Sequence, residues 1–252
     1  MSHFYYNEGD KIRLSESVDS AAKARKSKTK VYPSVTTKLS YLPNGFIGQW
    51  KDKKIVELAR EFPEKELEEL QELRWGTRTM PDGSTVSSSH FGTLVHEQIE
   101  LATNAYIEGA DYHNFDWLEY YRPVIAWFED CHVHPKHTEY LVADDNYNTA
   151  GSIDGVGKDL KTGQIILWDM KTRAAGKNIK DKAYAKDAAQ LAVEADIIRK
   201  QWELDYMPRI YTIVIDADTG EPYFKLWTEK AQAKALAQFD AVSKFYDAIE
   251  GL

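Results

Sequence analysis

The sequence predicts an α/β fold in which helices precede, interrupt and follow one central mixed β-sheet. Helical patterns dominate the first half of the chain, two strand patterns form a hairpin near its middle, and a further helical pattern separates this hairpin from two later strands. The predicted helices are 46–60, 64–74, 91–108, 116–129, 184–199 and 229–249; the predicted strands are 139–143, 151–155, 165–172, 209–216 and 223–228.

A chain of 252 residues is long enough to bury a sizeable core, and we expect one domain over residues 1–252. Its first part, residues 1–30, is basic, and we expect this arm to be mobile until a ligand orders it. A helical part over 31–110, a core over 130–228 and a C-terminal helix over 229–252 follow.

The hairpin is the most informative segment. Turn residues at 159–163, Asp-Leu-Lys-Thr-Gly, separate two strand-like segments. If the turn is centred between Lys161 and Thr162, Asp154 and Asp169 lie opposite each other with Cβ atoms roughly 5 Å apart. Lys171 then shares their face, because side chains on a strand alternate with a period of two.

Two facing carboxylates repel each other, and a divalent cation would relieve the repulsion. The lysine could orient or deprotonate a water molecule, or stabilise charge on a phosphate. The alternative is a solvated hairpin whose outer face carries these charges. That alternative is weakened because Ile165 and Leu167 share the face of Asp169 while other apolar residues fill the opposite face, so a charge pair on this central strand needs a reason.

These residues resemble the PD-(D/E)XK nuclease superfamily, in particular its RecB-like branch, which includes the mitochondrial genome maintenance exonuclease type and phage exonucleases. The run from Gly151 through Asp154 to Asp169-Met170-Lys171-Thr172 carries the core of the resemblance. Residues 92–100 resemble the helical motif of the branch, and residues 32–37, Tyr-Pro-Ser-Val-Thr-Thr, resemble an N-terminal element of the mitochondrial-type relatives. The resemblance implies a restriction-endonuclease-like αβββαβ core with an N-terminal helical extension.

A fourth segment departs from the pattern of the branch. Gln190 matches the glutamine of its Gln-x-x-x-Tyr motif, but Glu194 stands where a tyrosine is expected. The contribution of that tyrosine to nucleic-acid binding is therefore in doubt in this chain.

The resemblance also implies roles for individual residues. Asp154, Asp169, His96 and the Met170 carbonyl would hold Mg²⁺ or Mn²⁺, Lys171 would position or activate the nucleophile, and Gln190 would contact the nucleic-acid backbone or orient Lys171. Glu100 lies four residues after His96, hence on the same helical face, and is a further candidate. Glu139 is another, because it precedes the hairpin where relatives tend to carry a glutamate.

Candidate nucleic-acid contacts lie on either side of this centre. Hydroxyls of Ser34, Thr36 and Thr37 could meet a phosphate at a helix start, or could be simple helix caps. Arg173, Lys177 and Tyr184 follow the predicted catalytic strand. Net charge is −8, yet two basic runs flank the predicted site and favour a groove for a nucleic-acid backbone. They are Lys23, Arg25, Lys26, Lys28 and Lys30, and Lys171, Arg173, Lys177, Lys180 and Lys182.

The single cysteine, Cys131, excludes an intrachain disulfide and the four-cysteine iron–sulfur cluster of some RecB-like nucleases. His132, His134 and His137 lie close to it, but their spacing matches no zinc motif. We expect no membrane span and no secretion signal, and therefore a cytoplasmic location in a bacterial or phage-infected host cell.

The function expected from the resemblance is a metal-dependent DNA exonuclease that acts at single- or double-stranded ends in repair, recombination or replication, with a single-strand-binding or recombination protein as a partner. Two alternatives remain open. One is a structure- or site-specific endonuclease on the same core. The other is a non-catalytic nucleic-acid-binding protein that keeps the fold.

Overall fold

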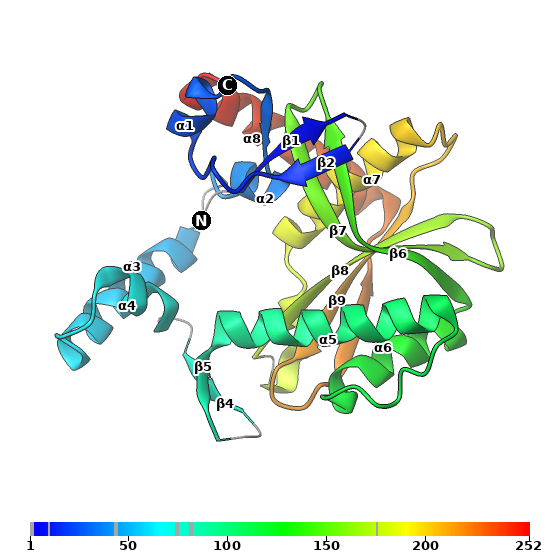
Figure 1. The fold of residues 1–252 in the computed structure, drawn as a ribbon, viewed down its shortest axis with the longest axis horizontal. Coiled ribbons are helices and arrows are strands. Elements are labelled where there is room, and N and C mark those ends of the chain that lie inside the picture. Colours follow the sequence, from blue (N-terminus) through cyan, green and yellow to red (C-terminus); the bar gives the residue numbers. More distant parts are fainter. Residues whose placement is uncertain (1–2, 10, 43–44, 74–75, 81–82, 175) are drawn as a thin grey trace.

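The centre of the protein is a five-stranded mixed sheet with helices on both faces, as the sequence predicts (Figure 1). The computed structural model describes residues 3–9, 11–42, 45–73, 76–80, 83–174 and 176–252. The strand order is β10-β9-β8-β7-β6, and only the β8–β9 pair is parallel. The strands are β6 (Val133–Asp144), β7 (Thr149–Asp159), β8 (Ile165–Arg173), β9 (Arg209–Asp216) and β10 (Pro222–Leu226).

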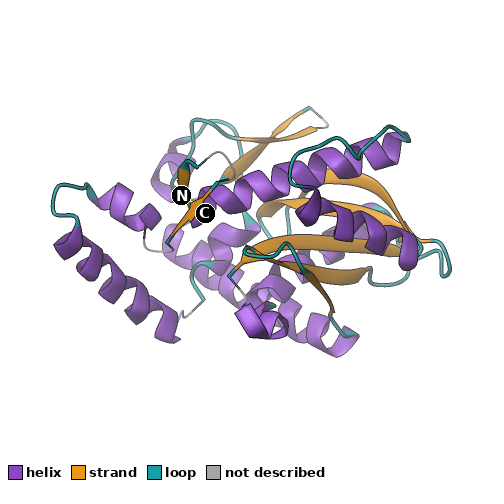
Figure 2. Cartoon of the chain, turned by 90° about the horizontal axis from the view of Figure 1, so that it is seen from below, coloured by secondary structure: helices purple, strands orange, loops and turns teal. Residues whose placement is uncertain are grey.

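Each face of the sheet packs on a different pair of helices (Figure 2). On one face, α5 (Ser88–Glu108) and α6 (Leu118–Asp130) bury Ile166, Trp168 and Met170 of β8. On the other, α7 (Ala185–Gln201) and α8 (Glu229–Glu250) bury Leu167. The prediction that β8 is apolar on both faces and central in the sheet is therefore confirmed.

The β7–β8 hairpin has the predicted register. Gly155 pairs with Trp168 and Lys158 with Ile165, which corresponds to a turn centred between residues 161 and 162. Asp159 builds the turn, because its Oδ1 accepts the N–H groups of Lys161 and Thr162 at 2.8 and 3.1 Å. Gly163 completes the turn at φ 76°, a backbone region that glycine adopts without steric cost.

Residues 3–9 and 11–30, where the sequence predicted no helix or strand, contain regular structure. Strands β1 (Phe4–Glu8) and β2 (Lys11–Leu14) join β3 (Val31–Pro33) in a second sheet of order β2-β1-β3, and α1 (Ala21–Lys26) lies between β2 and β3. Phe4, Val18 and Ala24 bury a small core there. Apolar burial and strand pairing across about 25 residues of chain account for the difference, and neither is visible as a local pattern.

The rest of the N-terminal half is helical, with short strands. Helices α3 (Gly45–Glu61) and α4 (Leu67–Leu73) confirm two predicted helices and project away from the sheet (Figure 1). The remaining elements are α2 (Val35–Leu39), β4 (Thr77–Thr79), β5 (Thr85–Ser87) and the 3₁₀ segment η1 (Gly176–Lys182). Among the described residues, none of the helices has both the length and the apolar character that a membrane span requires.

A fully buried lysine ties the N-terminal part to the C-terminal helix. The Lys38 ammonium, 0% exposed, donates to the Tyr147 carbonyl and the Ser243 hydroxyl, each at 2.8 Å. It also donates to both carboxylate oxygens of Asp247, at 2.8 and 2.9 Å. Burial lowers the pKa of Lys38, and Asp247 opposes this shift.

We expect Lys38→Met to lower the free energy of unfolding by about 2–4 kcal/mol, because it removes the charged donor that the Tyr147 carbonyl, the Ser243 hydroxyl and the Asp247 carboxylate share in a partly buried place. Urea unfolding would measure the loss. Lys244→Met is the matched control. Lys244 pairs with Asp240 on the surface of α8, the helix that also carries Asp247, and its loss should cost less than about 1 kcal/mol. Equal effects of the two substitutions would contradict this assignment.

Candidate functional site

The candidate site lies where strands β7 and β8 separate. Their last paired residues are Gly155 and Trp168, one position before Asp154 and Asp169. The Asp154 carboxylate accepts the Met170 N–H at 2.6 Å and so takes the place of a strand partner. Asp154 and Asp169 thus follow the predicted register, but the backbone ladder stops just before them.

On the α7 side of the sheet, Asp169 lies among Lys171, Gln190 and Glu194. Asp169 is 1% exposed, and its Oδ1 accepts from Lys171 Nζ at 2.7 Å and from Gln190 Nε2 at 3.1 Å. Gln190 also donates to Glu194 at 3.4 Å. Gln190 therefore contacts Asp169 and Glu194, and no hydrogen bond to Lys171 is found among the described residues.

Glu194 of α7 is the third carboxylate of this group. It is 1% exposed, and a Cβ added at Gly151 would lie 2.8 Å from its Oε1. Glycine at position 151 on β7 therefore leaves the space that this carboxylate occupies. Helix α7 thus brings a carboxylate to the centre opposite Gly151.

Helix α5 and strand β6 contribute from the other side. His96 Nδ1 lies 3.7 Å from Asp154 Oδ2. Glu139 stands between the β6–β7 pairs Thr138–Gly155 and Tyr140–Ile153, hence opposite Asp154, and has φ 45°. Its carboxylate accepts from Ser152 Oγ at 2.6 Å and acts electrostatically on Asp154, His96 and Glu100.

Burial and like charges make the ionised carboxylates of this centre unfavourable. Burial raises the pKa of Asp154 to about 6, although Lys171 and the Met170 N–H oppose the shift. Burial raises the pKa of Asp169 to about 7, with Asp154 adding to the shift and Lys171 opposing it. Burial, Asp169 and Asp154 raise the pKa of Glu194 well above its ordinary value.

The pKa values of the two basic groups, Lys171 and His96, shift in opposite directions. Burial disfavours the charged ammonium of Lys171, but the carboxylates of Asp169 and Asp154 outweigh it and raise the pKa. Burial, helped by Lys171, lowers the pKa of His96 to about 4. His96 is therefore neutral at pH 7, which is the form in which an imidazole binds a metal.

The donor set fits a hard divalent cation. Among the described residues, Asp169 Oδ2 and Glu194 Oε2 are buried oxygens without a hydrogen-bond partner, and such atoms are costly unless something pairs with them. Carboxylates are the ligands that Mg²⁺ and Mn²⁺ prefer. In the described part of the chain no three His, Cys, Asp or Glu side chains are already gathered at coordination distance, so the carboxylates would have to move together around an ion.

The hydroxyls of residues 34–37 act within the protein. Ser34 Oγ accepts the Thr37 N–H at 2.9 Å and caps α2, and it donates to Thr37 Oγ1 at 2.8 Å. Thr37 Oγ1 in turn accepts the His3 N–H at 3.1 Å. Ser34 and Thr37 are buried, so Thr36 is the exposed hydroxyl of the three. The capping alternative accounts for Ser34, and the Thr37 hydroxyl is used in contacts within the protein.

The predicted contacts after β8 also have structural partners. Arg173 forms two hydrogen bonds of 2.8 Å with Asp187, and its guanidinium lies 4.3 Å from the centre of the Tyr184 ring. This arrangement fixes the start of α7, where Tyr184 is the N-cap. Lys177 lies in η1, and its side chain is outside the described residues.

Part of each basic run forms ion pairs within the protein. In the first run, Lys23 pairs with Asp19, Arg25 with Glu250 and Lys30 with Asp145. In the second, Lys171 pairs with Asp169 and Arg173 with Asp187. Two of the partners, Glu250 and Asp145, lie 225 and 115 positions away in the sequence, so a count of local charge could not show these two pairs.

Tyr5 lies near the carboxylate centre, although no pattern in the sequence predicted it. Tyr5 of β1 is buried, and burial together with the nearby Glu194 and Glu139 raises its pKa to about 12. The N-terminal sheet thus reaches the carboxylate centre. The proximity of Tyr5 to these carboxylates arises from pairing between strands that are remote in sequence, and no motif at positions 4–8 indicates it.

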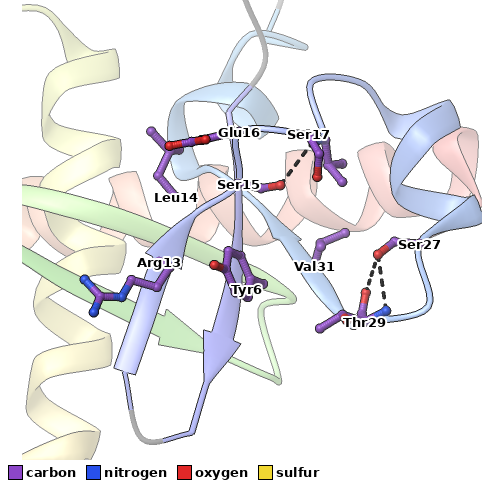
Figure 3. A pocket seen from close by; sticks show the side chains of 10 residues that line it. Tyr6, Arg13, Leu14, Ser15, Glu16, Ser17, Ser27, Thr29 and Val31 are labelled. Atoms are coloured by element: carbon purple, nitrogen blue, oxygen red, sulfur yellow. Dashed lines mark hydrogen bonds between the residues drawn. The ribbon is translucent and has the colours of Figure 1, made fainter.

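A separate pocket of about 530 Å³ lies on the N-terminal sheet (Figure 3). Two of its hydroxyls form hydrogen bonds with nearby backbone groups: Ser15 Oγ accepts the Val18 N–H at 3.1 Å, and Ser27 Oγ accepts the Thr29 N–H at 3.2 Å. The pocket therefore offers a ligand fewer polar groups than its composition suggests.

No protein-family model and no curated protein matches the chain. Among solved structures, it is similar to a "putative exonuclease" from Eubacterium rectale, with 14% identity and a TM-score of 0.38 over 61% of this chain and 68% of that one. It is also similar to SSO0001, with 10% identity and a TM-score of 0.32 over 82% and 84% of the two chains. Likenesses this remote carry no argument about activity, so function has to be inferred from the site.

We expect Glu194→Gln to stabilise the metal-free protein more at pH 8 than at pH 5. The pKa of Glu194 is higher in the folded protein than in the unfolded chain. The folded protein therefore loses stability as the pH rises from the pKa of the unfolded chain towards that of the folded protein. Glutamine does not ionise, so the variant does not lose this stability as the pH rises. Thermal unfolding in EDTA at both pH values would measure it, with the exposed Glu221→Gln as control; a pH-independent effect would contradict the burial of a protonated Glu194.

Proposed function

We propose that the protein is a metal-dependent nuclease that hydrolyses phosphodiester bonds in DNA. The observation that carries the proposal is the buried Asp169 carboxylate, which has one oxygen paired with Lys171 and the other without a partner, beside Asp154 at the point where β7 and β8 separate. A structural ion pair alone would leave the second oxygen and Glu194 unexplained.

The cation would be held by Asp154 and Asp169, with His96 and the Met170 carbonyl as further ligands. When bound, Mg²⁺ or Mn²⁺ supplies a Lewis acid and lowers the pKa of a coordinated water. The Met170 N–H orients Asp154, and Gln190 holds Asp169 through its Oδ1. These contacts leave Asp169 Oδ2 available for the cation.

Lys171 is the residue that distinguishes a hydrolytic centre from a simple cation site. Its raised pKa keeps it charged at neutral pH, which suits an ammonium that orients the nucleophilic water and stabilises negative charge on the phosphate. This role is favoured over that of a general base, which requires an uncharged amine.

The finer proposal is an exonuclease that acts at DNA ends in repair, recombination or replication, in line with the RecB-like resemblance. An endonuclease on the same centre would cut a closed circle, which an exonuclease cannot. A binding protein without turnover would retain DNA but leave it intact.

Lys171→Ala and Asp169→Asn should each reduce cleavage at least ~100-fold, because each removes a group that acts on the reacting phosphate or its cation. The assay uses linear DNA labelled at its 5′ or 3′ end, single- or double-stranded, and a closed circle, with Mg²⁺, Mn²⁺ or EDTA. Stepwise loss of label from linear DNA alone, abolished by EDTA, is the expected result.

Lys158→Ala is the matched control, since Lys158 is exposed on the same hairpin and should leave cleavage unchanged. Circular dichroism would establish that the variants fold. Full cleavage by folded Lys171→Ala protein would place the catalytic centre elsewhere.

A further inference from the structure

A second groove, of about 720 Å³, opens beside the carboxylate centre. Three elements form most of its walls, namely β2 of the N-terminal sheet, the C-terminal half of α5, and β6, and Gln201 at the end of α7 also lines it. Strands β2 and β6 are both edge strands of their sheets, so the groove lies between two sheet edges. Figure 1 shows the paired strands β1 and β2 on one side of β6 and α5 on the other.

Glu139 links the groove to the candidate site, because it lies opposite Asp154 on the neighbouring strand. Glu139 lines the groove and also acts electrostatically on His96 and Asp154. Along α5, residues 96, 100, 104 and 108 are four apart and therefore lie on one face. His96 and Glu100 lie at the centre, whereas Asn104 and Glu108 line the groove.

All three walls run outward from the centre. On β2, Leu14 pairs with Tyr5, the neighbour of Glu139 and Glu194, and Lys11 lies at the far end. On β6, the chain runs from Glu139 at the centre to Lys136. The cations Lys11 and Lys136 therefore stand at the outer end.

Cations and aromatic rings line this path. Lys11 and Lys136 are exposed, and neither makes an ion pair within the described part of the chain, whereas Arg13 pairs with Glu8 at 3.2 Å. The rings of His137 and Tyr140 lie 5.1 Å apart, and Tyr140 packs edge-on against Trp202 at 5.8 Å. Free cations beside aromatic faces are the chemistry that binds an unpaired nucleic-acid strand without reading its sequence.

We propose that this groove holds a single unpaired DNA strand that enters or leaves the carboxylate centre. The inference rests on the proposed function, because it requires the scissile phosphate to lie at Asp154 and Asp169. A groove of this volume is the size of a small-molecule site, which matches a few nucleotides of one strand. Lys11 and Lys136 contact phosphates, and Tyr140 stacks on a base.

The experiment measures binding separately from cleavage. Full-length protein carrying Asp169→Asn is titrated in EDTA with a fluorescein-labelled 20-mer of thymidine and with a 20-base-pair duplex, over a series of salt concentrations. Lys11→Ala/Lys136→Ala should weaken single-strand binding at least about tenfold at low salt and reduce the salt slope by roughly 1.4, since each phosphate contact contributes about 0.7. Lys234→Ala, an exposed lysine on α8, should change neither quantity.

Tyr140 supplies an independent test. Tyr140→Ala should weaken single-strand binding about tenfold, and Tyr140→Phe should retain it, because stacking needs the ring and not the hydroxyl. Unchanged affinity and salt slope in the lysine double variant would overturn the proposal, as would tighter binding of the duplex that depends on the same lysines. If the unmodified protein cleaves DNA while the groove variants bind normally, the groove assignment fails and the nuclease function stands. If the protein neither cleaves nor binds DNA, both fail.

Discussion

The arrangement of the site depends on one hydrogen bond, from the Met170 N–H to the Asp154 carboxylate at 2.6 Å. The ladder between β7 and β8 ends at Gly155 and Trp168, and a Cβ at Gly155 would lie 1.9 Å from the Trp168 ring. The indole therefore occupies the space beside Gly155 and marks the end of the pairing. Beyond it, the Asp154 side chain replaces the missing strand partner, which fixes its carboxylate between the sheet and α5.

The site where β7 and β8 separate contains more acidic than basic side chains. Asp154, Asp169 and Glu194 lie near one lysine, and the histidine beside them is neutral at pH 7. Metal-free protein can relieve this imbalance by taking up protons, as the raised pKa values of the carboxylates indicate. A divalent cation relieves it more effectively, because it pairs with the buried oxygens that protonation leaves without partners.

The sequence predicted the parts of this centre that depend on local rules. Turn residues at 159–163 and the period of two along the strands determined the hairpin register, and this register set Asp154, Asp169 and Lys171 in place. The helices at α3, α5, α7 and α8 followed from apolar periodicity.

The parts that depend on contacts between remote segments could not be predicted. The β1–β3 pairing, the burial of Tyr5 beside Glu194, and the Arg173–Asp187 pair arise from tertiary packing. The left-handed backbone at Glu139, which places it opposite Asp154, has no signal in the sequence either. The ion pairs of Arg25 with Glu250 and of Lys30 with Asp145 also join segments that are remote in the sequence.

Direct titration of the metal-free protein with Mn²⁺, followed by calorimetry at pH 8, tests the central claim most closely. The account predicts saturable binding that is lost in Asp154→Asn and in Asp169→Asn and is kept in Asp159→Asn, whose carboxylate pairs with Arg209 at the far end of the hairpin. Absence of binding in the unmodified protein, or equal binding in all four proteins, would contradict the assignment of Asp154 and Asp169 as the cation site.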